Sequence, residues 1–111
     1  MHVAENGNKY WYLNGELHRE DGPAVEYAGG TKFWYLNGKR HREDGPAIEY
    51  ANGDKYWYLN GKLHREDGPA VEYADGNKYW YLNDVQFLTI LHYTTALNDL
   101  MKQRLKTENI S

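Results

Sequence analysis

The chain of 111 residues has no cysteine, only three prolines, and a single serine, which is its last residue. Without cysteine there is no disulfide, no thiolate ligand for zinc and no thiol nucleophile. No run approaches the roughly 18 apolar residues of a membrane span, and the N-terminus lacks the apolar stretch of a secretory signal. We therefore expect no membrane span and a cytoplasmic location, and the length fits one domain or a few fused repeats.

A strong excess of charge is also missing, because the net charge is only −3. Nucleic-acid binding requires a basic surface, and none of the three full repeats described below is net positive, so we expect no nucleic-acid partner. Aromatic residues, by contrast, make up 15% of the chain, with eleven Tyr and four Trp. This mixture favours β-structure and surfaces that are apolar in body and polar at the tip.

A phrase of 23 residues recurs along the chain, and each copy opens with a lysine followed by an aromatic run. Such a period is the sequence signature of a repeat architecture. The copies are the full units 9–31, 32–54 and 55–77, a partial unit at 78–83, and residues 2–8, which resemble the tail of a preceding unit. We therefore divide the chain into a β-repeat array, residues 1–83, and a C-terminal capping helix and tail, residues 84–111.

Three turn signals recur in every unit and predict the fold. They are Asn-Gly at 14–15, 37–38 and 60–61, Asp-Gly-Pro at 21–23, 44–46 and 67–69, and a third break at 29–30, 52–53 and 75–76. Asn-Gly between apolar runs is a strong hairpin signal, and Gly-Pro interrupts a strand. The predicted fold is an all-β tandem repeat, an antiparallel meander of hairpins that forms either an elongated sheet or a solenoid.

Two-residue loops at Asn60-Gly61 and Asn52-Gly53 would also fix the strand register. The first places Tyr58 opposite Leu63, and the second places Ile48 opposite Trp57. Because strand side chains alternate, the two faces would then separate into two sets. These are Trp57, Leu59, Ile48, Tyr50 and His64 on a core face, and Tyr56, Tyr58, Leu63, Glu49 and Arg65 on a Tyr-rich, charged surface.

The C-terminal segment has helical periodicity, with Thr89 as the expected N-cap. Its apolar residues fall mostly three or four positions apart, at Ile90, Tyr93, Leu97, Leu100, Met101 and Leu105. We expect this helix to cap the end of the array, since repeat arrays expose an apolar end. The strand near His2, Val3 and Ala4 would be an open edge at the other end, which predicts a homodimer.

The repeated His-Arg-Glu-Asp cluster is the feature most suggestive of an active site, but its spacing argues against one. Histidines at 18, 41 and 64 would be roughly 10 Å apart in successive units, too far to share a metal ion. We expect Asp to hold the turn, Arg to pair with a carboxylate and His to pack beside Trp. With no calcium loop, phosphate loop or nucleophile motif either, we predict no enzyme activity, no catalytic residue, no metal and no cofactor.

The phrases N-G-K-L-H and E-Y-A-D-G resemble the MORN repeat, whose units place Asn-Gly, a His and a Tyr-Ala-Asp-Gly turn around an aromatic strand. The likeness covers residues 5 to about 83. Here Arg-Glu-Asp precedes Gly-Pro where MORN units carry Gly after His, a variant similar to repeats of uncharacterised bacterial and phage proteins. The resemblance implies an elongated sheet that acts as a protein-interaction scaffold, often dimerises and has been linked to lipid binding.

The aromatic rows are either cross-strand packing or a docking surface, and the two roles are compatible. We expect a non-catalytic protein-binding module, a phage-borne or mobile-element accessory protein that sequesters or inhibits a host protein such as an immune effector. The expected contact residues are Tyr12, Tyr35, Tyr58, Arg19, Arg42 and Arg65. The alternative is binding of choline, glycans or another small ligand in aromatic grooves between units, a looser similarity to choline- and glucan-binding cell-wall modules.

Overall fold

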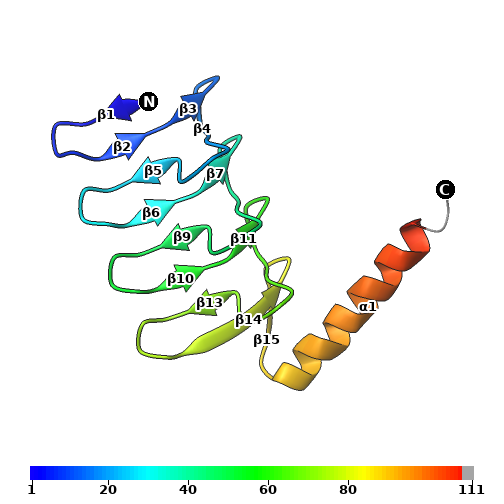
Figure 1. The fold of residues 1–111 in the computed structure, drawn as a ribbon. Helices are drawn as coiled ribbons and strands as arrows, with labels where there is room; N and C mark the ends of the chain where they lie inside the picture. Colours follow the sequence, from blue (N-terminus) through cyan, green and yellow to red (C-terminus); the bar gives the residue numbers. More distant parts are fainter. Residues whose placement is uncertain (109–111) are drawn as a thin grey trace.

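The repeated turns produce an open antiparallel sheet with a row of short hairpins along one side and one helix at the end (Figure 1). The computed structural model describes residues 1–108. A nine-stranded meander sheet contains β1 (His2–Val3), β2 (Lys9–Tyr10), β5 (Val25–Glu26), β6 (Lys32–Phe33), β9 (Ile48–Glu49), β10 (Lys55–Tyr56), β13 (Val71–Glu72), β14 (Lys78–Leu82) and β15 (Val85–Phe87), in that order. The predicted meander of repeated hairpins with a C-terminal helix is thus confirmed.

Each full unit also contributes one short hairpin beside the main sheet. These hairpins are β3 (Tyr12–Leu13) with β4 (Glu16–Leu17), β7 (Tyr35–Leu36) with β8 (Lys39–Arg40), and β11 (Tyr58–Leu59) with β12 (Lys62–Leu63). Their Asn-Gly turns have positive φ at both residues, for example 51° at Asn60 and 81° at Gly61, as two-residue hairpin loops require. The predicted pairing of Tyr58 with Leu63 and of Leu59 with Lys62 is confirmed.

The register predicted across Asn52-Gly53 is wrong by one residue. Ile48 pairs with Tyr56, not with Trp57, and Lys55 pairs with Glu49. The loop has three residues, because Tyr50 donates its N–H to the Asp54 carbonyl at 3.0 Å and accepts one from Gly53. Gly53 closes this loop with a φ of 102°, a conformation that glycine adopts without steric cost.

The shifted register changes the two faces of the sheet. Ile48 and Tyr56 are cross-strand partners and therefore point to the same side, so the predicted separation of these two residues is wrong. One face carries aromatic and aliphatic residues, while lysines and glutamates alternate across the other, as in the pairs of Lys55 with Glu49 and Glu72. The small core repeats with the units and consists of Ala24, Val25, Ala47, Ile48, Ala70 and Val71, all buried.

Backbone hydrogen bonds between successive units join the short hairpins into a column. Gly38 donates its N–H to the Leu17 carbonyl at 2.9 Å, and Arg19 donates to the Tyr35 carbonyl at 3.1 Å. The same pattern recurs one unit later. Each hairpin is therefore supported by the next one, which is the nearest-neighbour stabilisation expected of repeat proteins.

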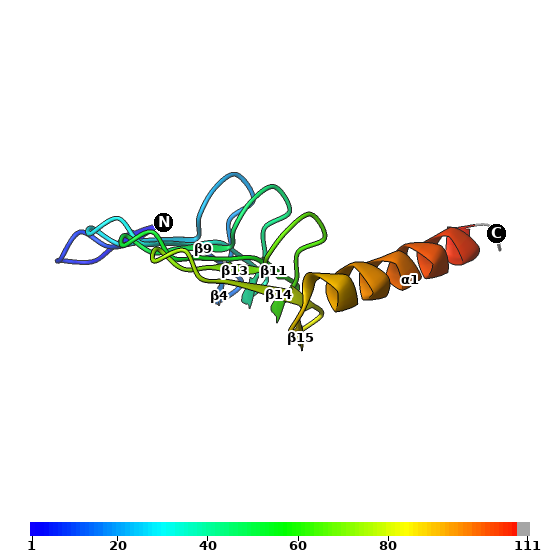
Figure 2. The ribbon, with the colours of Figure 1, turned by 90° about the horizontal axis from the view of Figure 1, so that it is seen from below.

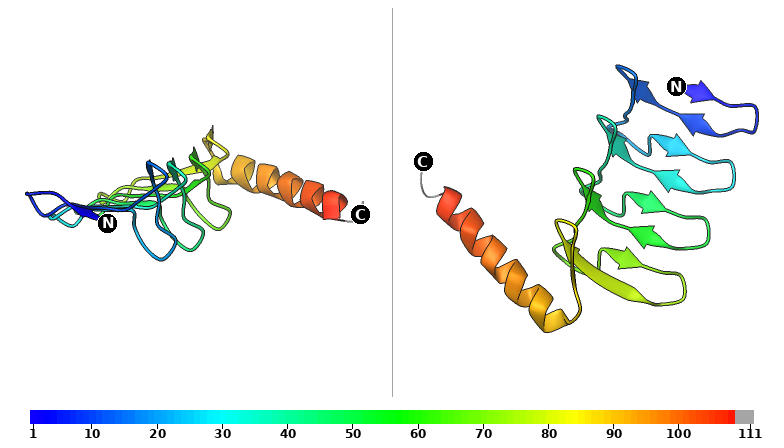
Figure 3. Two further views of the ribbon diagram at one scale, coloured as in Figure 1. Left: turned by 90° about the horizontal axis from the view of Figure 1, so that it is seen from above. Right: turned by 180° about the vertical axis from the view of Figure 1, so that it is seen from behind.

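Three loops project from one face of the sheet, residues 18–23, 41–46 and 64–69, and we call them the first, second and third loops (Figure 2). They begin at the histidine and end at the proline of each unit. Seen from above, they stand in a row on the same side of a thin sheet (Figure 3). The principal extents of 49 × 41 × 17 Å describe a plate rather than a barrel or a closed solenoid.

Helix α1 (Ile90–Glu108) leaves the last hairpin and runs obliquely away from it (Figures 1 and 3). Thr89 is its N-cap, as predicted, because Thr89 Oγ1 accepts the His92 N–H at 3.1 Å. Of the expected apolar stripe, Tyr93 is buried, whereas Ile90 and Leu105 stay exposed because only part of the helix has sheet against it. The predicted boundary at 83/84 falls inside the turn between β14 and β15, and residues 109–111 of the predicted tail lie outside the described residues.

No helix within residues 1–108 has both the length and the apolar character needed to cross a membrane.

Candidate interaction surfaces

A continuous row of aromatic rings crosses the main sheet, and we call it the aromatic ladder. In spatial order it contains Tyr10, Tyr27, Phe33, Tyr50, Tyr56, Tyr73 and Tyr79. Neighbouring centroids lie 5.4–6.5 Å apart with interplanar angles of 68–85°, the edge-to-face geometry that aromatic pairs prefer. Every strand from β2 to β14 is thus bridged by ring contacts.

The ladder is a surface as well as a packing device. Tyr27 and Tyr50 are each about 40% exposed, and the remaining rings are half-buried or exposed. Desolvation, followed by the hydrogen bond with Tyr73, raises the pKa of Tyr56 above its ordinary value, so this hydroxyl stays neutral at physiological pH. The result is one extended face of neutral aromatic rings with polar tips.

The predicted contact residues Tyr12, Tyr35 and Tyr58 extend this face into the column of short hairpins. Tyr12 stacks on ladder residue Tyr10 at 6.5 Å, and it is 55% exposed. Arg40 joins the other two, because its guanidinium lies 5.4 Å from the Tyr58 ring and its Nε donates to the Tyr35 hydroxyl at 3.4 Å.

The predicted contact residues Arg19, Arg42 and Arg65 lie on tryptophans instead. Each guanidinium sits 3.9 Å from the ring centroid of the Trp in its own unit, at Trp11, Trp34 and Trp57. The Trp precedes the predicted Tyr in each aromatic run, so the two side chains point to opposite sides of the strand. The structure therefore does not bring the predicted Tyr and Arg residues together.

Each of these arginines also holds its loop closed. Arg19 Nε donates to Asp21 at 2.9 Å, and its Nη1 donates to the Pro23 carbonyl at 3.1 Å and lies 3.9 Å from Glu26. Arg42 and Arg65 repeat these contacts. The expectation that Arg pairs with a carboxylate is confirmed, and the donors of these three guanidinium groups are largely used within the chain.

The histidines connect successive units. His41 Nδ1 accepts the backbone N–H of Asn60 in the next unit at 2.9 Å, and His18 and His64 do the same for Asn37 and Asn83. An accepting Nδ1 places the ring proton on Nε2, which faces the glutamate two residues on. The ring is thus neutral and serves as a structural connector, with one histidine per groove.

Two grooves separate the three loops. Groove 1, about 670 Å³, lies between the first and second loops over Trp34 and Leu36. Groove 2, about 740 Å³, lies between the second and third loops over Trp57 and Leu59. Acidic residues stand on their rims, including Glu20 and Glu43, whose side chains are 84% exposed.

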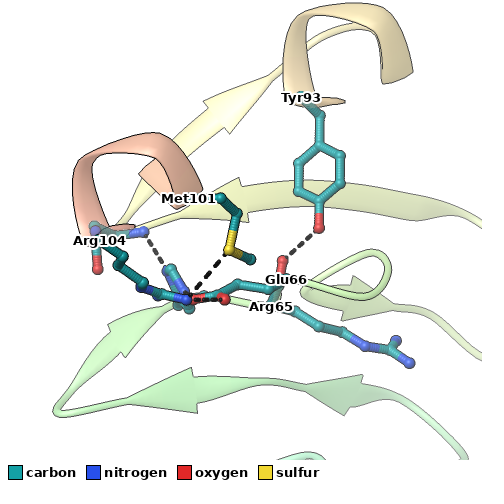
Figure 4. A network of polar contacts seen from close by, with 7 residues as sticks. Arg65, Glu66, Tyr93, Met101 and Arg104 are labelled. Atoms are coloured by element: carbon teal, nitrogen blue, oxygen red, sulfur yellow. Dashed lines mark hydrogen bonds and ion pairs between the residues drawn. The ribbon is translucent and has the colours of Figure 1, made fainter. Parts of the chain in front are cut away.

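The third loop differs from the others because helix α1 docks on it (Figure 4). Tyr93 donates its hydroxyl to the Arg65 carbonyl at 2.6 Å, and Arg104 forms a two-point ion pair with Glu66, while Met101 lines groove 2. The Arg104 guanidinium, and secondarily His64, lower the pKa of Glu66 from 4.5 to about 2. The glutamate is therefore a carboxylate over the whole physiological range.

The predicted dimerisation residues His2, Val3 and Ala4 lie at the N-terminal edge of the sheet. β1 pairs with β2 on one side and is the first strand of the sheet order, and both of its residues are exposed. Within residues 1–108, no three His, Asp or Glu side chains gather into a group that could hold a metal ion.

Sequence reasoning missed most of the ladder residues and the docking of the helix on Glu66. The ladder depends on the three-residue loop that places Tyr50 on the same side as Tyr56. A signal existed in the repeats, because the residue before Gly varies in this loop (Gly29, Asn52, Asp75) but is Asn in every two-residue turn. Family models, curated proteins and solved structures provide no match to this chain.

Proposed function

We propose that this chain is a non-catalytic protein-binding module and that the aromatic ladder, continued by Tyr12, Tyr35 and Tyr58, is its binding face. The observation that carries the proposal is the unbroken row of half-exposed rings across the sheet. Tyrosine supplies a large contact area at a low cost in side-chain entropy and is enriched at energetically important interface positions. A contiguous exposed aromatic patch of this kind is typical of an interaction site.

The partner class follows from the resemblance of the repeated phrase to MORN-like repeats of bacterial and phage proteins. We propose an accessory factor of phage or mobile-element origin that sequesters or inhibits a host protein, such as an immune effector. A rigid plate with a wide aromatic face suits this role, since it can cover a partner's surface without contributing any chemistry. The exposed edge strand β1 supports the accompanying proposal of a homodimer, which light scattering at micromolar concentration would test.

Small-ligand binding is the second candidate, and the two grooves favour it by size, since ligand sites commonly enclose about 300–1,000 Å³. A choline-like cation, however, needs a free aromatic face. The Trp faces already carry the chain's own Arg19, Arg42 and Arg65. Titration of tryptophan fluorescence with choline and glucans would separate the candidates, because a protein binder gives no saturable change.

The decisive experiment is affinity capture from the native host with wild type and with the triple variant Tyr12→Ala, Tyr35→Ala and Tyr58→Ala. We expect the variant to lose the captured partner at least tenfold while keeping its circular dichroism spectrum, because truncated interface aromatics commonly cost 2 kcal/mol or more, about thirtyfold in affinity. The matched control is Lys9→Ala, Lys32→Ala and Lys55→Ala, which alters the opposite face. Equal capture by both variants would reject the aromatic face as the binding surface.

A further inference from the structure

The third loop shows what kind of group a loop of this repeat accepts. Arg104 meets Glu66 through both terminal nitrogens, with Nη1 2.7 Å from Oε1, and Arg104 Nη1 lies 3.6 Å from the sulfur of Met101 (Figure 4). Met101 precedes Arg104 by three positions and lines groove 2. An arginine and an apolar residue on one face of a helix therefore fill the rim and the mouth of one groove.

The equivalent positions of the other loops have no such ligand. Glu20 and Glu43 correspond to Glu66, and within residues 1–108 each makes an ion contact only with the histidine of its own unit, at 3.6 Å. Asp21 and Asp44 are paired with Arg19 and Arg42. The negative charge at Glu20 and Glu43 is thus left without a cation, on both sides of an open groove floored by Trp34 and Leu36.

We propose that groove 1, with Glu20 and Glu43 on its rims, binds a helix of a partner protein that carries two arginines seven residues apart, each preceded by an apolar residue three positions earlier. The arginines pair with the two glutamates and the apolar side chains enter the groove and its margin. This surface lies on the loop side of the sheet and is separate from the aromatic ladder.

The spacing follows from the repeat. Each unit adds two strands to the main sheet, so equivalent loop positions are about 10 Å apart at roughly 4.8 Å per strand. Seven residues of α-helix rise about 10.5 Å and return to the same face. An extended strand fails, because residues three apart point to opposite sides. A polyproline II segment is the competing occupant, since it repeats every three residues at about 9.3 Å.

The test uses the full chain and fluorescence anisotropy with a labelled peptide of about 18 residues, cross-linked to hold it helical. It carries two Met-x-x-Arg pairs seven residues apart. A second peptide of the same composition places the pairs five residues apart, and a third is a polyproline peptide with arginine at every third position. The protein variants are Glu20→Gln with Glu43→Gln, and the charge-matched control Glu5→Gln with Asp99→Asn, both exposed and not among the residues lining either groove.

We expect saturable binding of the seven-residue peptide, weakened about tenfold by the Glu20/Glu43 double variant and less than twofold by the control, because charge-assisted hydrogen bonds are the strong ones. The five-residue peptide should bind at least tenfold more weakly. Three results would overturn the proposal: no saturation up to about 1 mM, equal binding of the two helical peptides, or tighter binding of the polyproline peptide. The ladder variants affect the opposite face, so this test and that of the proposed function fail independently.

Discussion

The two ends of the array contain the same residues in opposite environments. Leu13 of the first hairpin is 49% exposed, whereas Leu82, its equivalent in the last hairpin, is 6% exposed. The intervening Leu36 and Leu59 are half-buried or close to it. Since the local sequence around these leucines is nearly identical, their burial is set by what stacks on each hairpin and not by the hairpin itself.

The difference shows how a plate one sheet thick remains folded. A single hairpin buries little apolar area, so each unit depends on its neighbours, and the last depends on the helix. Tyr93 fills this role at the C-terminal end, where it is 4% exposed and contacts the Phe87 ring at 6.2 Å. At the N-terminal end nothing in the described structure covers Tyr12 and Leu13, and both are available to a partner.

Removal of the capping ring should have the largest effect. Tyr93→Ala should lower the free energy of unfolding by about 3 kcal/mol, as is typical for the truncation of a buried aromatic side chain. Urea denaturation followed by circular dichroism measures the change. Tyr93→Phe keeps the ring and removes only the hydrogen bond to the Arg65 carbonyl, so it should cost about 1 kcal/mol. If the alanine variant is no less stable than the phenylalanine variant, the helix is not the cap.

The matched leucines give the next effect. Leu82→Ala should cost about 2 kcal/mol because the side chain is buried, while Leu13→Ala should cost less than about 0.5 kcal/mol because it already faces solvent. Both variants remove the same atoms from the same repeat position, and urea midpoints compare them directly. Equal losses would mean that the two ends are equally packed.

The smallest effect concerns pH. Arg104 lowers the pKa of Glu66 to about 2, so the folded state favours the carboxylate and gains stability above pH 4.5. This contribution should decline as the pH falls from 4.5 towards 2, and it should be below about 1 kcal/mol, because Arg104 is half-exposed and water screens the pair. Urea midpoints at pH 6 and pH 3 should differ less in Glu66→Gln than in wild type. Glu43→Gln, whose glutamate lacks an arginine partner from the helix, should retain the wild-type difference.

The fold was predictable because its turn chemistry is local. Asn at positive φ followed by Gly permits few loops, and the helix N-cap at Thr89 follows from one side chain and one N–H. The register across Asn52-Gly53 was not, because Asn-Gly fits both a two-residue turn and the end of a three-residue loop, and the choice moves every side chain to the other face. The Arg104–Glu66 pair joins residues 38 positions apart, so no local pattern could reveal it.

The site was predictable only in kind. An excess of Tyr indicated an aromatic face, and Tyr12, Tyr35 and Tyr58 do continue the ladder or lie beside it in the hairpin column. The stacking of Arg19, Arg42 and Arg65 on tryptophan depends on how the three loops fold back over the sheet, a tertiary feature. The same folding creates the two grooves, which have no counterpart in any local motif.

The central claim is that the aromatic ladder contacts a protein partner. Hydroxyl-radical footprinting of the chain, alone and in complex with its captured partner, tests this most directly because it reports on individual side chains. We predict that Tyr27, Tyr50 and Tyr12 become protected in the complex while the exposed Ile90 and Leu91 of the helix do not change. Full reactivity of all three tyrosines in a saturated complex would contradict the claim.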